Sequence, residues 1–151
     1  MGSYKLTLKI YNTGDWPFEK VAVYGREITA AMRKLVDRFP NDLTMESMAQ
    51  EIISGKQQLW LILDGEEFKA FVTSEIKINE ATGRKTVLLM ELAGDGGIDL
   101  VPMIADIEKW AVDIGAHELT PLGRDGWRKP LAKAGYRPKL TLYSKDLTHG
   151  R

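Results

Sequence analysis

Hydrophobic and polar residues near the start of the chain alternate first with the period of a strand and then with that of a helix. Leu6, Leu8 and Ile10 alternate with polar neighbours, which predicts a half-buried strand. Over 26–39 the apolar residues recur every three or four positions, which predicts an amphipathic helix that Pro40 ends.

A second helix is predicted directly after the first. Thr44 is a residue type that caps helix N-termini, residues 45–53 carry one apolar face, and Gly55 follows as a typical terminator. The segment 16–25 combines strand-like valines with the start of a helical pattern, and its type stays open.

The middle of the chain returns to strand-like patterns. A continuous apolar run at 59–63 is followed by the turn pair Asp64 and Gly65 and by an alternating run over 68–78, which predicts a hairpin. The run 86–92 does not alternate, so we expect a third strand that is buried on both faces. Together these segments predict an antiparallel meander.

The last third mixes both periods. A glycine-rich turn at 93–97 precedes a helix over 100–114, which Asp99 would cap and which has Pro102 in its first turn. The remaining predicted elements are a strand at 118–122, a helix at 125–134 and a final strand through Leu140, Leu142 and Tyr143. The pattern predicts an α+β fold, sandwich-like, with a mixed and mostly antiparallel central sheet flanked by helices.

Composition narrows the chemistry. The 151 residues with 44% hydrophobic content predict one domain over 1–151. The absence of cysteine excludes thiolate chemistry and Cys-ligated metals, and His117 and His149 are the only imidazoles, so we expect no metal. Without a signal-like or membrane-spanning apolar stretch, a cytoplasmic protein with no membrane partner is expected.

The order of the elements resembles that of the GNAT superfamily of acetyl-CoA-dependent N-acetyltransferases, best over 59–147. Two local pieces carry the resemblance. Ile-Glu-Lys-Trp-Ala at 107–111, followed by Gly115 and Leu119, is similar to the family's central helix and fifth strand. The piece Arg-Lys-Pro-Leu-Ala-Lys-Ala-Gly-Tyr at 128–136 is similar to its late helix.

The resemblance implies acetyl-CoA as cofactor and an amine, on a small molecule or a protein, as acceptor. The cofactor would lie at the junction of strand, turn and helix, where backbone N–H groups and a helix dipole favour a pyrophosphate. We expect a V-shaped opening between the strands around Leu61 and Leu89. The predicted cofactor-binding residues are Leu89, Met90, Leu92, Gly94, Asp95, Gly96, Gly97 and Ile98.

The glycine-rich turn departs from the family pattern. Glu91 or Leu92, depending on the register, occupies the place of the usual Arg or Gln, and Asp95 and Asp99 bring negative charge toward a phosphate site. Leu131 stands where many members have a tyrosine that donates a proton. A catalytically inactive GNAT-fold binding or structural protein, as in phages and prophages, is therefore the alternative to an N-acetyltransferase.

Several residues have two interpretations. Glu91 is either a desolvated general base or a salt-bridged strand end, and Tyr143 is either a substitute proton donor or a residue at the edge of the core. The turn either cradles phosphate or only provides positive φ. His117 is interpreted as a polar residue entering a strand rather than a catalytic group.

Charge is unevenly distributed although the chain as a whole is neutral. The last 28 residues carry eight basic side chains against Asp125 and Asp146. These basic side chains could bind the 3′-phosphate of coenzyme A, a nucleic acid or an acidic protein. The alternative is an ordinary helix face exposed to solvent. The zero net charge of the chain does not favour a nucleic acid as the partner. The sequence does not decide whether the protein forms a homo-oligomer.

Overall fold

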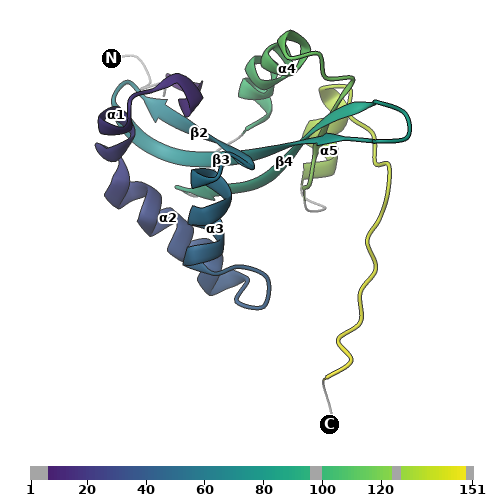
Figure 1. Cartoon of the computed structure of the whole chain (residues 1–151), viewed down its shortest axis with the longest axis horizontal. Coiled ribbons are helices and arrows are strands. Elements are labelled where there is room, and N and C mark those ends of the chain that lie inside the picture. The colour runs from purple at the N-terminus through teal and green to yellow at the C-terminus, as the bar shows by residue number, and fades with distance from the viewer. Residues whose placement is uncertain (1–6, 96–99, 124–126, 149–151) are drawn as a thin grey trace, which may run out of the picture.

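The computed structural model describes residues 7–95, 100–123 and 127–148 (Figure 1). The elements in chain order are β1 (Leu8–Asn12), the 3-10 turn η1 (Thr13–Asp15), α1 (Phe18–Ala22), α2 (Gly25–Arg38), α3 (Met45–Ile53), β2 (Gln57–Asp64), β3 (Glu67–Ile78), β4 (Lys85–Gly94), η2 (Val101–Met103), α4 (Ile104–Asp113), β5 (Glu118–Pro121) and α5 (Arg128–Lys133).

The strands form one sheet in the order β1-β2-β3-β4-β5. Neighbours pair antiparallel except β4 and β5, which are parallel. The predicted hairpin between β2 and β3 is confirmed, with Gly65 at φ 62° in its turn, a conformation that glycine adopts without steric cost. The α+β fold with a mixed, mostly antiparallel sheet is likewise confirmed.

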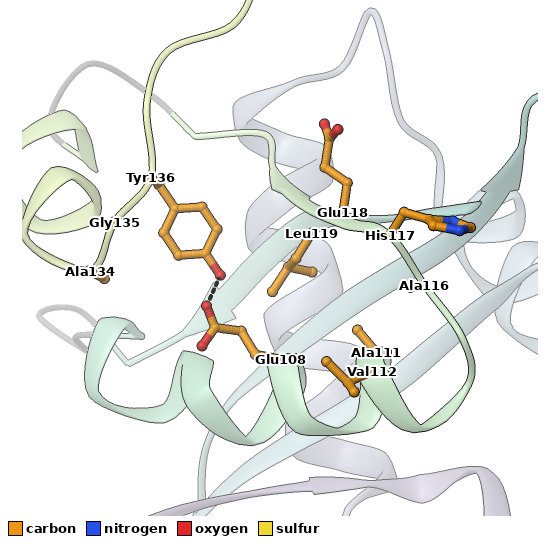
Figure 2. A pocket seen from close by; sticks show the side chains of 10 residues that line it. All are labelled: Glu108, Ala111, Val112, Ala116, His117, Glu118, Leu119, Ala134, Gly135 and Tyr136. Carbon is orange, nitrogen blue, oxygen red and sulfur yellow. Dashed lines mark hydrogen bonds between the residues drawn. The ribbon is translucent and has the colours of Figure 1, made fainter. Parts of the chain in front are cut away.

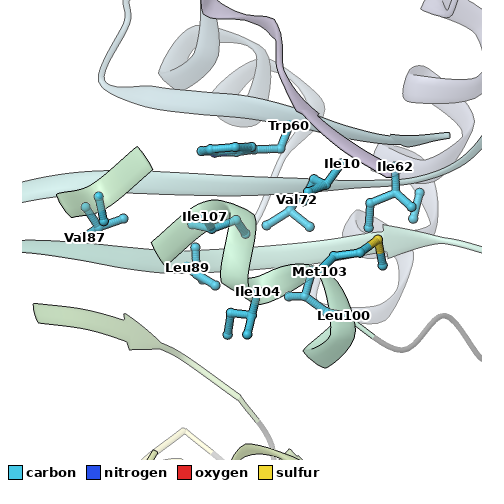
Figure 3. Close-up of a cluster of buried hydrophobic side chains, with 12 residues drawn as sticks. Ile10, Trp60, Ile62, Val72, Val87, Leu89, Leu100, Met103, Ile104 and Ile107 are labelled. Atoms are coloured by element: carbon cyan, nitrogen blue, oxygen red, sulfur yellow. The ribbon is translucent and has the colours of Figure 1, made fainter. Parts of the chain in front are cut away.

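One face of the sheet packs against α4 and η2 (Figure 3). Ile107 of α4 is completely buried there against Val72 and Val87. Trp60 meets Trp110 edge-on with ring centroids 5.2 Å apart, and its indole N–H donates to the Ser74 hydroxyl at 2.9 Å. The indole thus brings apolar area to the core while its polar atom is satisfied.

The opposite face packs against α2 and α3, the two helices predicted from helical spacing. Ile28 and Leu35 of α2 are buried against Leu61 and Phe71 of the sheet. The predicted cap at Thr44 is confirmed, because its hydroxyl accepts from the amide of the third helical residue in a reciprocal capping box. The segment left open contains α1, a short helix without a buried residue.

β4 differs from the predicted strand with two buried faces. Only Val87, Leu89 and Ala93 are buried on it, whereas β2 and β3 contain the continuous buried runs. The register against β3 skips Met90, which makes Met90 the extra residue of a β-bulge. A bulge reverses the alternation, so Leu89 and Leu92 both pack toward α4 although they are three residues apart. This reversal is the reason that the apolar residues of β4 do not alternate.

The predicted final strand is wrong. Residues 137–148 run in an extended path away from the sheet without strand pairing (Figure 1). Leu140 is 90% exposed, Leu142 95% and Tyr143 88%. The alternating pattern is present in the sequence, but no strand in the described part of the chain pairs with this segment and buries its apolar side chains.

Candidate functional site

β4 and β5 lie side by side over only part of their length. They pair in parallel from Thr86 to Leu89 on β4, and the Leu122 amide donates to the Leu89 carbonyl at 2.9 Å. β4 then continues over 90–94 after β5 has ended. Within the described residues, this end of β4 has β3 on one side and no strand on the other.

The unpaired edge of β4 presents peptide groups at defined positions. The Asp95 amide donates to the Lys69 carbonyl at 2.8 Å, so residue 95 points its N–H toward β3. Because backbone groups alternate between the two sides of a strand, the peptide groups of Leu92 and Gly94 point away from β3. An extended ligand that carries amides can pair with such an edge as an added strand does.

The expected opening lies elsewhere than predicted. We expected it between the strands around Leu61 and Leu89, but β3 lies between β2 and β4 and pairs with both. The pairing that stops early is the one between β4 and β5. The bulge at Met90 directly follows the last residue of β4 that pairs with β5, and bulges bend and twist the strand that contains them.

Gly94 is required by a close approach of two backbones. A Cβ on residue 94 would lie 2.4 Å from the Lys69 carbonyl oxygen and 2.5 Å from the Ala70 Cα, and φ is 145°. This conformation and this contact exclude a side chain. The glycine-rich turn was interpreted either as a phosphate cradle or as a backbone conformation that requires glycine. The second interpretation is sufficient to explain Gly94.

Asp95 is engaged with β3 through both its backbone and its side chain. Its amide is used by the Lys69 carbonyl, and its carboxylate lies 3.8 Å from the Lys69 ammonium. The same ammonium contacts Glu67 at 3.2 Å, and this hydrogen bond raises the pKa of Lys69, which keeps the amine charged at neutral pH. The Asp95 amide is thus not available to a phosphate, and Lys69 offsets part of the negative charge.

Sequence reasoning did not single out Lys69. A lysine on an alternating strand carries no signal of its own, and only the register of β3 against β4 places it beside Asp95. The predicted residues Gly96, Gly97 and Ile98, together with the cap Asp99, lie outside the described residues.

The two predicted catalytic residues are not brought together. Glu91 pairs with Thr73 across β3 and β4, is partly exposed, and shares the α2 and α3 face with Ala93 because side chains two apart point the same way. Tyr143 lies on the exposed C-terminal segment rather than on a strand of the sheet.

A pocket of about 380 Å³ lies between α4, β5 and the end of α5 (Figure 2). Two of the residues that line the pocket are hydrogen-bonded to each other: the Tyr136 hydroxyl donates to the Glu108 carboxylate at 2.5 Å. Burial, with a further contribution from this hydrogen bond, raises the pKa of Tyr136, so the phenol stays protonated. Tyr136 therefore fixes the chain after α5 to α4, and Leu131 of α5 packs against the same core as α4.

Two polar residues at the start of β5 also have structural partners. The Nδ1 atom of His117 accepts from the Lys85 amide at 3.0 Å, which agrees with a polar residue entering a strand. Glu118 accepts from Arg84 at 3.0 Å and from Lys139 at 3.1 Å, and these hydrogen bonds, that of Arg84 most, lower the pKa of Glu118 to about 2.

Two kinds of feature are absent from the described residues. No group of three or more His, Asp or Glu side chains is placed to hold a metal ion there. In that same part of the chain, no helix has the length and apolar character to cross a bilayer.

Comparison with known proteins identifies the architecture. No family model matches the sequence, and no curated protein matches it. Solved structures do match. Glucosamine-6-phosphate N-acetyltransferase from Arabidopsis thaliana is 14% identical with a TM-score of 0.65, over 93% of this chain and 99% of that chain.

Two other solved structures show the same similarity. A Trypanosoma brucei acetyltransferase is 12% identical with a TM-score of 0.65, over 93% of this chain and 99% of that one. A predicted acetyltransferase from Clostridium acetobutylicum, solved with acetyl-CoA, is 8% identical with a TM-score of 0.61, over 96% and 100%. The chain therefore has the fold of the GNAT acetyltransferases.

Proposed function

We propose that the chain is an N-acetyltransferase of the GNAT type, with acetyl-CoA along the unpaired edge of β4 and an amine as acceptor. The observation that carries this proposal is the peptide edge of residues 90–94, which has no strand on its outer side among the residues that the structure describes. When bound, acetyl-CoA supplies an activated thioester carbonyl that a neutral amine attacks.

The residues fit an extended, amide-containing arm. Leu89 and Met90 mark the place where the pairing of β4 with β5 ends, and the outward peptide groups of Leu92 and Gly94 would hold the arm. At the end of β4 the Lys69 ammonium, 3.8 Å from the Asp95 carboxylate, would reduce the repulsion between Asp95 and the phosphates. The Asp95 amide, already used by β3, takes no part in this site.

Glu91 is the proposed general base. Its carboxylate lies on the face covered by α2 and α3, one residue beyond the bulge, and is partly exposed to an acceptor on that side. It accepts the proton of the acceptor's ammonium group, directly or through water, so that the amine becomes nucleophilic. The proton-donor role of Tyr143 stays a prediction that a Tyr143→Phe variant tests by its kcat.

A proline at position 92 tests the binding mode. Because the Leu92 N–H points away from β3, Leu92→Pro removes a donor for the ligand without removing a sheet hydrogen bond. We expect Leu92→Pro to weaken acetyl-CoA binding about tenfold or more in calorimetry, the loss of one well-placed hydrogen bond and its geometry. Leu92→Ala, which keeps the N–H, is the control and should bind nearly as wild type.

Turnover is measured separately by thiol release from acetyl-CoA with a panel of amines. Glu91→Gln should lower kcat and shift its pH profile, while Glu80→Gln in the exposed β3–β4 turn should not. No heat and no thermal shift at millimolar acetyl-CoA would refute the proposal. Binding without turnover on any amine would instead support the inactive GNAT-fold binding protein, the second candidate that Leu131 at the tyrosine position favours.

A further inference from the structure

Consecutive polar residues in the middle of β3 are buried inside the sheet, and most of their polar atoms have partners. Ser74 is completely buried on the α4 face, where its hydroxyl accepts from the Trp60 indole at 2.9 Å and donates to the Gln58 side chain at 2.8 Å. Glu75 is also buried, and its carboxylate accepts from the Gln57 side-chain amide at 3.3 Å. These two residues follow the general rule that buried polar groups are hydrogen-bonded.

Thr73 is the exception to this rule. It is 1% exposed, and within the part of the chain that the structure describes its hydroxyl has no hydrogen-bond partner. Valine has nearly the same shape, is equally suited to a strand and would leave no hydroxyl buried without a partner. The fold by itself therefore favours valine at this position, and the hydroxyl indicates a use other than stability.

The place of Thr73 in the sheet indicates what this use is. Thr73 pairs directly with Glu91 of β4, so the two side chains lie next to each other on the face covered by α2 and α3. Directly opposed residues of such a pair have Cβ atoms about 4.5–5.5 Å apart. On its other side Thr73 faces Leu59 of β2, which is apolar and buried. The polar side chain across the strand pair from the hydroxyl is thus the proposed general base.

We propose that Thr73 is a positioning residue that holds the Glu91 carboxylate, an inference that rests on the role of Glu91 in the proposed function. Rotation about the Cα–Cβ bond moves a threonine hydroxyl between staggered positions and can turn it toward β4. A hydroxyl both donates and accepts, so it can hold Glu91 in both protonation states. It donates to the carboxylate at first. Once an N–H bond of the acceptor's ammonium group has broken and the proton is bound to a Glu91 oxygen, it accepts from the carboxylic acid.

A valine at position 73 tests this role, with serine as the conservative variant. Thr73→Val removes the hydroxyl and keeps the shape of the side chain. We expect kcat to fall about tenfold while KM for the amine changes by less than about twofold, because the lost hydrogen bond acts on the step in which Glu91 takes the proton. Thr73→Ser keeps the hydroxyl and should retain most of kcat. Thiol release from acetyl-CoA with the panel of amines measures both constants.

Stability separates a positioning role from a structural one. Thr73→Val should unfold at the same urea concentration as the wild type or a higher one, since no hydroxyl remains buried without a partner. Thr73→Ser should unfold at a lower concentration, because it leaves the space of a methyl group empty. The order of the two variants in stability is thus the reverse of their order in kcat. Thr86→Val, the same substitution in the part of β4 that pairs with β5, is the control and should keep the wild-type kcat.

A double-mutant cycle shows whether Thr73 acts through Glu91. In the Glu91→Gln background no carboxylate is left to position, so Thr73→Val should lower kcat there by no more than about twofold. Residues that act as a unit give such non-additive effects, whereas a general disturbance of the sheet would lower kcat by the same factor in both backgrounds.

Several results would overturn the inference while leaving the proposed function intact. They are a Thr73→Val variant with the kcat of the wild type, a Thr73→Ser variant as slow as Thr73→Val, or an equal loss from Thr73→Val with and without Glu91. A protein that binds acetyl-CoA but acetylates no amine would also overturn it, because there is then no proton transfer to assist. The absence of any acetyl-CoA binding by the wild type is a separate observation, and it would refute the proposed function together with this inference.

Discussion

The close approach of Gly94 to β3 makes a quantitative prediction for Gly94→Ala. The new methyl carbon would lie 2.4 Å from the Lys69 oxygen, 2.5 Å from the Ala70 Cα and 2.8 Å from the Ala70 Cβ, so backbone must move. Overpacking of this kind costs about 1–3 kcal/mol, and the positive φ adds about 1–2 kcal/mol for a residue with a Cβ. We expect the free energy of unfolding to fall by about 2–5 kcal/mol.

A second glycine separates the two contributions. Gly83, in the turn between β3 and β4, has φ 75°, and a Cβ built on it meets nothing within 4 Å. Gly83→Ala therefore carries only the cost of its conformation, about 1–2 kcal/mol. Urea unfolding of both variants, followed by circular dichroism, gives the difference. If Gly94→Ala were destabilised no more than Gly83→Ala, the close approach of β4 to β3 at Lys69 would be refuted.

Three other variants test contacts elsewhere in the fold. Tyr136→Phe removes the hydrogen bond to Glu108 and should lower the free energy of unfolding in urea by about 1–2 kcal/mol; no change would mean that the bond does not anchor α5. Thr44→Ala removes the cap of α3 and should cost about 1 kcal/mol, measured in the same way, with equal stability as the contrary result. Glu118 has a pKa near 2, below its ordinary 4.5, because of Arg84 above all, so its contribution is present above about pH 4.5 and is lost as the pH falls toward 2. Glu118→Gln should therefore lower the free energy of unfolding at pH 7 by about 1 kcal/mol, a small value because water screens these surface charges. Near pH 2 the variant and the wild type should be equally stable. A constant difference between them across this pH range would contradict the assignment.

The helices and the hairpin were predictable because their signals are local. The apolar spacing over 26–39 indicated α2, and Thr44 marked the start of α3. The turn at Asp64 and Gly65 joined β2 to β3. Each of these features depends on residues a few positions apart, which a single sequence records directly.

The site was only partly predictable. The resemblance directed attention to β4 and to the turn that follows it, and Gly94 and Glu91 are there. The bulge at Met90 was missed, since one unpaired residue shows itself only in the register against β3. The link from Lys69 to Asp95 was missed for the same reason, because 26 positions separate the two residues in the chain.

The sequence by itself determined the order and type of most elements and the caps and turns between them. It also excluded any chemistry that needs a cysteine side chain. These properties follow from backbone preferences and side-chain periodicity within short windows. Tertiary structure alone decided where the pairing of β4 with β5 ends, which peptide groups face outward, and that residues 137–148 do not join the sheet. Pairing between distant strands depends on which edges are already occupied, and an alternating segment becomes a strand only where a free edge lies within its reach.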